Sequence, residues 1–265
     1  KVWFKFDNTS KQPKVYISFR IETSVVFQDA KNFQLAKLYE AAIRESLNEL
    51  VYPIQMAGLS YSLGIEEKGV TLTIGGYSKR VEDLLILVTR NLTEIQIDKQ
   101  KFKNIKEFMI RGLKNRKLAK AYYRGGYYNR MLWLKNRYTE EEELAALGPL
   151  VLDDLKQFTK KLYDKVYITG MAHGNWTDEM VNKSVSSLIK SLGSQPLSEN
   201  ERFEQELEVL EKGERYRFSR EVEDNNNSLA YAIQIGEKSV ELLALASIVS
   251  SIVENDFYTQ MRTNQ

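Results

Sequence analysis

Apolar and polar residues alternate without interruption over residues 14–22, which is the period of a strand with one buried face. From residue 29 the apolar positions recur every three or four residues as far as residue 50. This spacing predicts a long amphipathic helix, which Pro53 kinks near its end. Two more alternating runs, 61–65 and 70–74, flank a short turn and predict a β-hairpin.

Helical periods dominate the middle of the chain. They predict helices over residues 78–92, 98–113, 118–134 and 151–162, and a further helix that begins at Thr139. Thr139 and Glu142 have the spacing of a capping box at the start of one of these helices. A strand over 165–173 and a helix that is capped by Thr177 and runs to residue 192 follow. This order predicts an α+β fold with a mostly antiparallel sheet and helices packed on one face.

The last part of the chain begins the same order again. Residues 193–202 have the composition of a linker, and alternation then predicts strands over 215–222 and 229–235 around a turn at 224–227. Ser239 precedes an apolar helical run that reaches residue 253. We therefore expect one complete module, residues 1–197, followed by a linker and the start of a second module, residues 198–265. On this interpretation the chain is part of a longer protein.

Bulk composition excludes several classes of function. Hydrophobic residues make up 43% and charged residues 28% of the 265 positions, the balance of a globular domain. No apolar run approaches the roughly eighteen residues of a membrane span, and we expect no membrane partner. The 38 basic and 36 acidic residues leave a net charge of +2, too small to steer a charged ligand. The absence of cysteine excludes thiolate chemistry and is compatible with the cytoplasm or the periplasm.

The single histidine, His173, limits metal and triad chemistry. A catalytic zinc commonly has three protein ligands, and a Ser-His-Asp arrangement would need His173 as its base. No serine lies in a Gly-x-Ser-x-Gly context. Residues 166–175 are typical of a strand that runs into a Gly-Asn turn, so we expect His173 to be a strand-end residue satisfied by the backbone.

Clusters of charge have two interpretations. Residues 111–137 contain basic and aromatic residues with an Arg-Gly-Gly sequence at 124–126, which is typical of modules that bind single-stranded nucleic acid. A lone Arg-Gly-Gly, helical core spacing and the small net charge make this the weaker alternative function. Three acidic groups resemble acid-base dyads, but their places at caps and turns predict solvated structural roles. These groups are Glu66-Glu67, Glu140 to Glu143 and Asp153-Asp154.

Several short segments, in order along the chain, carry a resemblance to a known family. They are Leu47-Asn48-Glu49 with Ala57-Gly58-Leu59-Ser60-Tyr61, Gly75-Gly76-Tyr77, Ile97-Asp98-Lys99-Gln100-Lys101-Phe102, His173-Gly174-Asn175 and Phe257-Tyr258-Thr259-Gln260-Met261-Arg262-Thr263. Together they resemble the M16 zinc metallopeptidases of the pitrilysin/insulysin type, and the similarity extends over essentially the whole chain.

The resemblance implies a four-module enzyme whose two halves close around peptide substrates, each module having the α+β (LuxS-like) fold. The first module of the family carries His-x-x-Glu-His and a distal Glu, which hold zinc and activate water. This chain has no such motif and matches the third module plus the start of the fourth. We therefore expect no cofactor here and zinc in the parent enzyme. The implied partners are peptide substrates and the N-terminal catalytic half of the same protein.

One substrate contact is implied by the family. Its fourth module has an arginine, followed seven residues later by a tyrosine, and both reach the substrate. Arg262 matches that arginine, and the tyrosine position falls after Gln265. A helix-end cation that is favoured by the helix dipole is the alternative interpretation of Arg262.

The function implied for this chain is a non-catalytic, chamber-forming and substrate-enclosing part of a zinc metalloendopeptidase, inactive by itself. The basic stretch 111–137 would then line the chamber or contact the partner half. A catalytically dead scaffold subunit of the same family is the alternative.

Overall fold

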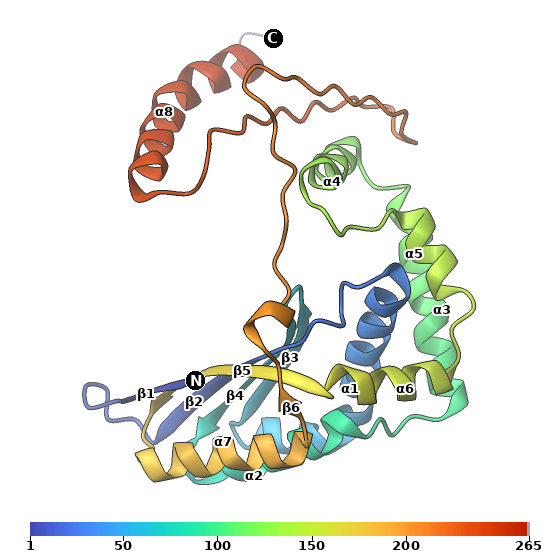
Figure 1. Cartoon of the computed structure of the whole chain (residues 1–265). Coiled ribbons are helices and arrows are strands. Elements are labelled where there is room, and N and C mark those ends of the chain that lie inside the picture. Colours follow the sequence, from blue (N-terminus) through green and yellow to red (C-terminus); the bar gives the residue numbers. More distant parts are fainter. Residues whose placement is uncertain (264–265) are drawn as a thin grey trace. The chain divides into compact units, whose positions relative to one another are not determined.

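The computed structural model describes residues 1–263 and contains two compact units (Figure 1). The first unit comprises Lys1–Glu208 and Arg220–Ser228, and the second comprises Val209–Ser219 and Leu229–Gln265. Each unit is described by itself.

A six-stranded sheet forms the centre of the first unit. Its strands are β1 (Val2–Phe6), β2 (Lys14–Glu22), β3 (Ser60–Glu66), β4 (Gly69–Tyr77), β5 (Lys165–Gly174) and β6 (Gln195–Pro196). Five strands follow the order β1-β5-β2-β4-β3, and β6 also pairs with β5. The β1–β5 and β5–β6 pairs are parallel and the others are antiparallel. The predicted mostly antiparallel sheet is confirmed, whereas the sequence pattern did not predict β1 or β6.

The described residues of the first unit form seven α-helices, four of which begin at a side-chain cap. They are α1 (Ala30–Met56), α2 (Ser78–Thr93), α3 (Lys99–Arg116), α4 (Ala121–Trp133), α5 (Glu140–Leu147), α6 (Leu152–Leu162) and α7 (Asp178–Leu192). The carboxylates of Asp29 and Asp98 and the hydroxyls of Thr139 and Thr177 each accept a hydrogen bond from a backbone N–H of the first turn. After α7, Gly193 takes the left-handed conformation of a helix C-terminus, with φ 62°.

One face of the sheet is covered by helices, as predicted. Val15, Ile17, Phe19 and Ile21 of β2 are at most 1% exposed, because their side chains alternate onto the helix-covered face. Helix α2 packs against β4, α1 and α7, and α1 packs against β3. Figure 1 shows α2 and α7 side by side below the sheet.

A buried tyrosine pair links three of the helices. The Tyr39 hydroxyl of α1 donates to the Leu92 carbonyl at the end of α2, 2.9 Å away. That carbonyl belongs to the last turn, where no intrahelical donor is available. Because the one Tyr39 proton is used there, the Tyr163 hydroxyl after α6 donates to Tyr39 across 2.6 Å.

Three predicted elements need correction. The helix expected over 118–134 begins only at Ala121, since residues 117–119 form a turn after α3. The linker expected over 193–202 contains β6 and the 3₁₀ turn η1 (Glu199–Glu201). The strands expected over 215–222 and 229–235 do not form in the described residues. An alternating pattern indicates which side chains would lie on each face of a strand. A strand forms, however, only where a neighbouring strand pairs with its backbone N–H and C=O groups.

The second unit contains one long helix, α8 (Val240–Tyr258), which continues into a single π-helical turn, η2 (Thr259–Thr263). The Ser239 hydroxyl caps α8 by accepting from the Leu242 N–H at 3.1 Å. Its apolar side chains are exposed; for example, Ile252 is 68% exposed and Val240 86%.

Candidate functional site

The face of the sheet opposite to α2 and α7 carries exposed side chains, and we call it the open face. It is made by two neighbouring rows of residues that the strand register places side by side. Across β1, β5, β2 and β4, the first row consists of Lys5, His173, Tyr16 and Gly75. The second row, on the same strands, consists of Trp3, Met171, Ser18 and Thr73. Trp3 is 52%, Tyr16 51% and Met171 61% exposed. Such a concentration of large apolar side chains on one surface is typical of a binding site.

Contacts within the open face hold these side chains in place. The ring of Tyr16 lies across Gly75 so closely that a Cβ at Gly75 would overlap it. The hydroxyls of Ser18 and Thr73 are hydrogen bonded at 2.9 Å. The Lys1 ammonium lies 4.8 Å from the centre of the Trp3 ring. The open face therefore offers apolar rings beside hydroxyls, a combination that accommodates both side chains and main-chain groups of a peptide.

His173 is the second-last residue of β5, at the strand end as predicted, and its side chain lies on the open face. Its imidazole is exposed and has no hydrogen-bond partner within residues 1–263, so the expectation of a backbone partner is wrong. Its register neighbours are Lys5 and Tyr16. Because the neighbouring Lys5 is a cation, the position is unfavourable for a zinc ligand.

The arginine of the Arg-Gly-Gly sequence is buried. Arg124 is 6% exposed, and its guanidinium donates to the Glu140 carboxylate at 2.6 Å and to the Tyr128 hydroxyl at 2.7 Å. The rings of Tyr127 and Tyr128 lie 5.0 and 4.9 Å from the guanidinium carbon. Arg124 is therefore part of the interior between α4 and α5, where a nucleic-acid phosphate has no access.

The acidic run that follows neutralises three cations of the basic stretch 111–137. Glu140 pairs with Arg124, Glu141 with Lys117, and Glu143 with Arg116. Glu140 and Glu143 are only 1% and 4% exposed, so the predicted solvated role is wrong for these two carboxylates. Burial is possible because each is compensated by a cation from another helix.

Arg262 is the residue for which the resemblance implies substrate contact. It lies in η2 of the second unit and is exposed, and its guanidinium carbon is 5.3 Å from the centre of the Tyr258 ring one turn earlier. No carboxylate within residues 1–263 forms an ion pair with it. Its role as a substrate contact stays a prediction.

Residues 1–263 show neither a metal cluster nor a membrane-spanning helix. They contain no group of three or more His, Cys, Asp or Glu side chains that is arranged to hold a metal ion. Of the helices in this range, none combines the length and the apolar character needed to cross a bilayer.

Comparison with known families decides the identity of the chain. Residues 1–146 match the middle or third domain of peptidase M16, and residues 149–265 match the peptidase M16 inactive domain. This chain belongs to the M16 peptidase family. The predicted family, α+β fold and combination of the third module with a C-terminal inactive one are confirmed. The boundary that we expect after residue 197 stays a prediction.

Relatives of this M16 chain are found among both sequences and structures. A nardilysin-like protein of Arabidopsis thaliana is 30% identical over 275 residues, and the insulin-degrading enzyme of Homo sapiens is 27% identical over 271. Each alignment covers 100% of this chain but 26% of the relative, so the chain spans about a quarter of their length. The crystal structure of pitrilysin matches 73% of this chain and 21% of its own with a TM-score of 0.68 and 17% identity, a likeness of fold.

The open face was only partly evident in the sequence. The alternation over 14–22 places Tyr16 and Ser18 on the face away from the core. Trp3 and Met171 were not predicted as site residues. Trp3 lies in β1, which the pattern did not predict, and Met171 lies on the outward side of β5. The alternation of residues 167–173 was the signal that could have located Met171.

Proposed function

We propose that this chain is a non-catalytic, chamber-forming part of an M16 zinc metalloendopeptidase and that its open face contacts the enclosed peptide. The observation that carries the proposal is the exposed set Trp3, Tyr16 and Met171 on a sheet whose other face is filled by helices. Exposed aromatic residues on a rigid sheet bind apolar side chains of many sequences, as a chamber wall for varied peptides requires.

The zinc of the family does not fit this chain. Its sole imidazole, His173, lies next to Lys5, and residues 1–263 hold no ligand cluster. We propose that the metal and the water-activating glutamate belong to the N-terminal catalytic half. Isolated, the chain is then expected to retain only substoichiometric zinc after dialysis, as measured by elemental analysis, and to leave peptides intact.

Arg262 is proposed as a second substrate contact. It is exposed, and within residues 1–263 no carboxylate neutralises it. A free guanidinium can donate two hydrogen bonds to one carboxylate or to main-chain carbonyls of a peptide.

Binding of fluorescein-labelled insulin B chain, followed by anisotropy, tests the open face. This probe is chosen because several relatives are named for degrading insulin. We expect weak saturable binding that the double substitution Trp3→Ser, Met171→Ser weakens about tenfold, since two exposed apolar contacts are lost. Tyr52→Ser removes a 63% exposed ring from α1 and serves as the matched control, with unchanged binding.

Unchanged affinity of the double variant would show that the open face is not the contact surface. No binding by a folded chain, up to millimolar peptide, would favour the catalytically dead scaffold, because a scaffold has no need to bind free peptide.

A further inference from the structure

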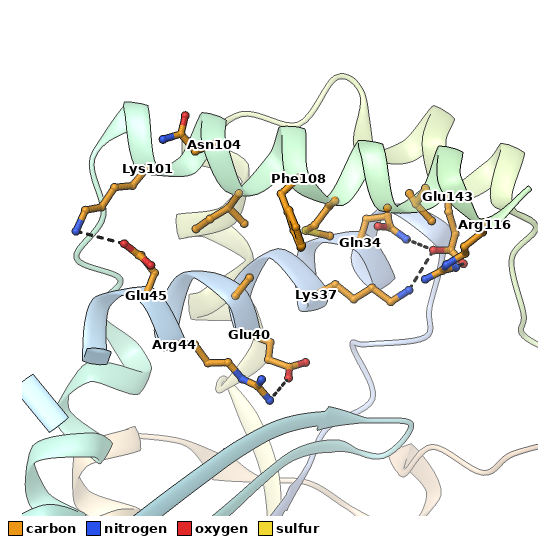
Figure 2. A pocket seen from close by; sticks show the side chains of 15 residues that line it. Gln34, Lys37, Glu40, Arg44, Glu45, Lys101, Asn104, Phe108, Arg116 and Glu143 are labelled. Atoms are coloured by element: carbon orange, nitrogen blue, oxygen red, sulfur yellow. Dashed lines mark hydrogen bonds and ion pairs between the residues drawn. The ribbon is translucent and has the colours of Figure 1, made fainter. Parts of the chain in front are cut away.

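A groove of about 660 Å³ runs between α1 and α3 of the first unit (Figure 2). Its apolar lining includes Ala41 of α1 and Ile105 and Phe108 of α3. Phe108 is 71% exposed, which is unusual for a phenylalanine that has a core beside it. The groove therefore offers an aromatic surface that the fold itself does not use.

Charge is unevenly distributed along the groove. At one end Glu45 pairs with Lys101 at 3.6 Å, one acid with one base. At the other end the single carboxylate of Glu143, whose side chain is 5% exposed, faces both Lys37 at 3.0 Å and Arg116 at 3.5 Å. Burial lowers the pKa of Lys37 from its usual 10.5, although Glu143 acts in the opposite direction. The end at Glu143 thus has one positive charge in excess, in a partly dehydrated setting.

A buried acceptor without a partner lies at the same end. The Gln34 amide nitrogen donates to Glu143 at 2.8 Å, whereas the Gln34 oxygen has no hydrogen-bond partner among residues 1–263. Gln34 is 0% exposed, and Figure 2 shows its oxygen turned along the groove toward Phe108. Buried polar atoms are nearly always paired, so this oxygen is an acceptor left for a donor that the described fold does not supply.

A glycine inside α3 gives such a donor room. An added Cβ at Gly112 would meet no atom within 4 Å, so no neighbouring residue of the fold requires a glycine there. Glycine inside a helix lowers helix stability relative to alanine. Its presence one turn after Phe108 is explained if another backbone passes close to α3 at this point.

We propose that the groove between α1 and α3 binds a short acidic peptide segment. An apolar side chain of the segment lies against Phe108, and its backbone passes over Gly112. A main-chain N–H donates to the Gln34 oxygen, and a carboxylate accepts from Arg116 and Lys37. This is the helix-lined, groove-type mode of peptide recognition, with charge complementarity selecting an acidic partner. The proposal does not depend on the open face, because it uses no residue of that face.

Anisotropy with a fluorescein-labelled, C-terminally amidated peptide, Glu-Leu-Phe-Glu-Leu-Glu, tests the proposal on the whole chain. We expect this peptide to bind at least about tenfold more tightly than Lys-Leu-Phe-Lys-Leu-Lys and than Glu-Ser-Ser-Glu-Ser-Glu. Gly112→Leu should weaken binding about tenfold or more by filling the path of the backbone. Arg116→Gln should weaken it by a similar factor and reduce its dependence on salt.

Two variants serve as controls. Gly126→Leu makes the same change in α4, where an added Cβ also meets nothing within 4 Å, and should leave binding unchanged. The open-face double variant Trp3→Ser, Met171→Ser should likewise bind this peptide normally, which separates the groove from the proposed chamber surface. Equal binding of acidic and basic peptides, or wild-type affinity of Gly112→Leu, would overturn the proposal. So would sedimentation showing that Gly112→Leu dissociates a dimer, because the occupant would then be a second copy of the chain.

Discussion

Two long helices of this chain, α1 and α8, have opposite environments. In α1 the apolar residues Leu38, Ile43 and Leu47 are 0% exposed beneath the sheet and its neighbouring helices. In α8 Leu243, Leu245 and similar residues are between half and nine-tenths exposed. The chemical character of the side chains is the same, so the difference lies in what surrounds them.

The two helix sequences differ in how apolar residues are distributed around the helix axis. Helix α1 has polar residues along one side and buries the other, which is the pattern of a helix at the edge of a core. Helix α8 is apolar around most of its circumference from Val240 to Val253, which is typical of a helix with packing partners on several sides. In the first unit α1 has its packing partners, namely β3 and the neighbouring helices. Within the second unit the described residues do not cover the apolar side chains of α8.

The largest effect is expected from matched leucine truncations. Leu38→Ala in α1 should cost about 2–5 kcal/mol of unfolding free energy, because it leaves a cavity in a closed core. Leu245→Ala in α8 should change it by less than about 0.5 kcal/mol, since Leu245 is 59% exposed. All three tryptophans lie in the first unit, so urea unfolding followed by tryptophan fluorescence reports the core of that unit. Comparable losses for the two variants would contradict the difference in burial.

The buried ion pair of the first unit should rank next. Arg124→Ala leaves the Glu140 carboxylate 1% exposed and without its cation, which should destabilise the unit by about 3 kcal/mol. Replacing both residues, Arg124→Met with Glu140→Leu, should restore most of that loss because no charge remains buried. Chemical denaturation of the three proteins measures both effects. A double variant no more stable than Arg124→Ala would show that the pair itself is required.

The tyrosine pair gives a smaller effect. Tyr39→Phe removes the donor to the Leu92 carbonyl and the acceptor of the Tyr163 hydroxyl, so we expect a loss of about 1–3 kcal/mol. Tyr163→Phe should cost less, about 1 kcal/mol, because Tyr39 keeps its bond to Leu92. Equal losses in a denaturant titration would argue against this division of donor and acceptor.

Local periodicity in the sequence was sufficient to predict most of the strands and helices of the first unit. The alternation of β2 and of the hairpin, and the caps Asp29, Asp98, Thr139 and Thr177, are properties of neighbouring residues, and the structure confirms them. Strands β1 and β6 depend instead on parallel pairing with β5, a partner distant in sequence from β1. Their short lengths carry too few alternating positions to predict a strand.

The candidate functional sites were harder to predict from the sequence than the helices and strands. Arg124 follows Ala121 by three residues on the buried side of α4, a spacing that indicates burial, but its charge suggested a surface. The α1–α3 groove joins residues of two helices far apart in the chain, so no local pattern reveals it. The family resemblance supplied what periodicity could not, namely the domain type and Arg262 as a candidate.

The smallest expected effect is on stability and depends on pH. It arises from Glu201 in the turn η1, which follows α7. The Lys165 ammonium at 2.7 Å and the Ser198 hydroxyl and N–H lower the pKa of Glu201 from the usual 4.5 to about 2. Because the pKa is lower in the folded chain, the stabilisation is fully present above about pH 4.5 and declines as the pH falls toward 2. The pair is exposed, so the contribution is small and decreases with salt.

The unfolding midpoint of Glu201→Gln should therefore lie slightly below that of the wild type at pH 6, and the two should converge near pH 2, where Glu201 becomes protonated. Glu199→Gln, on the same turn, provides a control of equal charge change. A difference between Glu201→Gln and wild type that persists undiminished to pH 2 would place the effect in side-chain packing rather than in the carboxylate. Leu197 beside this turn is only 4% exposed, so a packing effect would mean that the core of the first unit extends to η1.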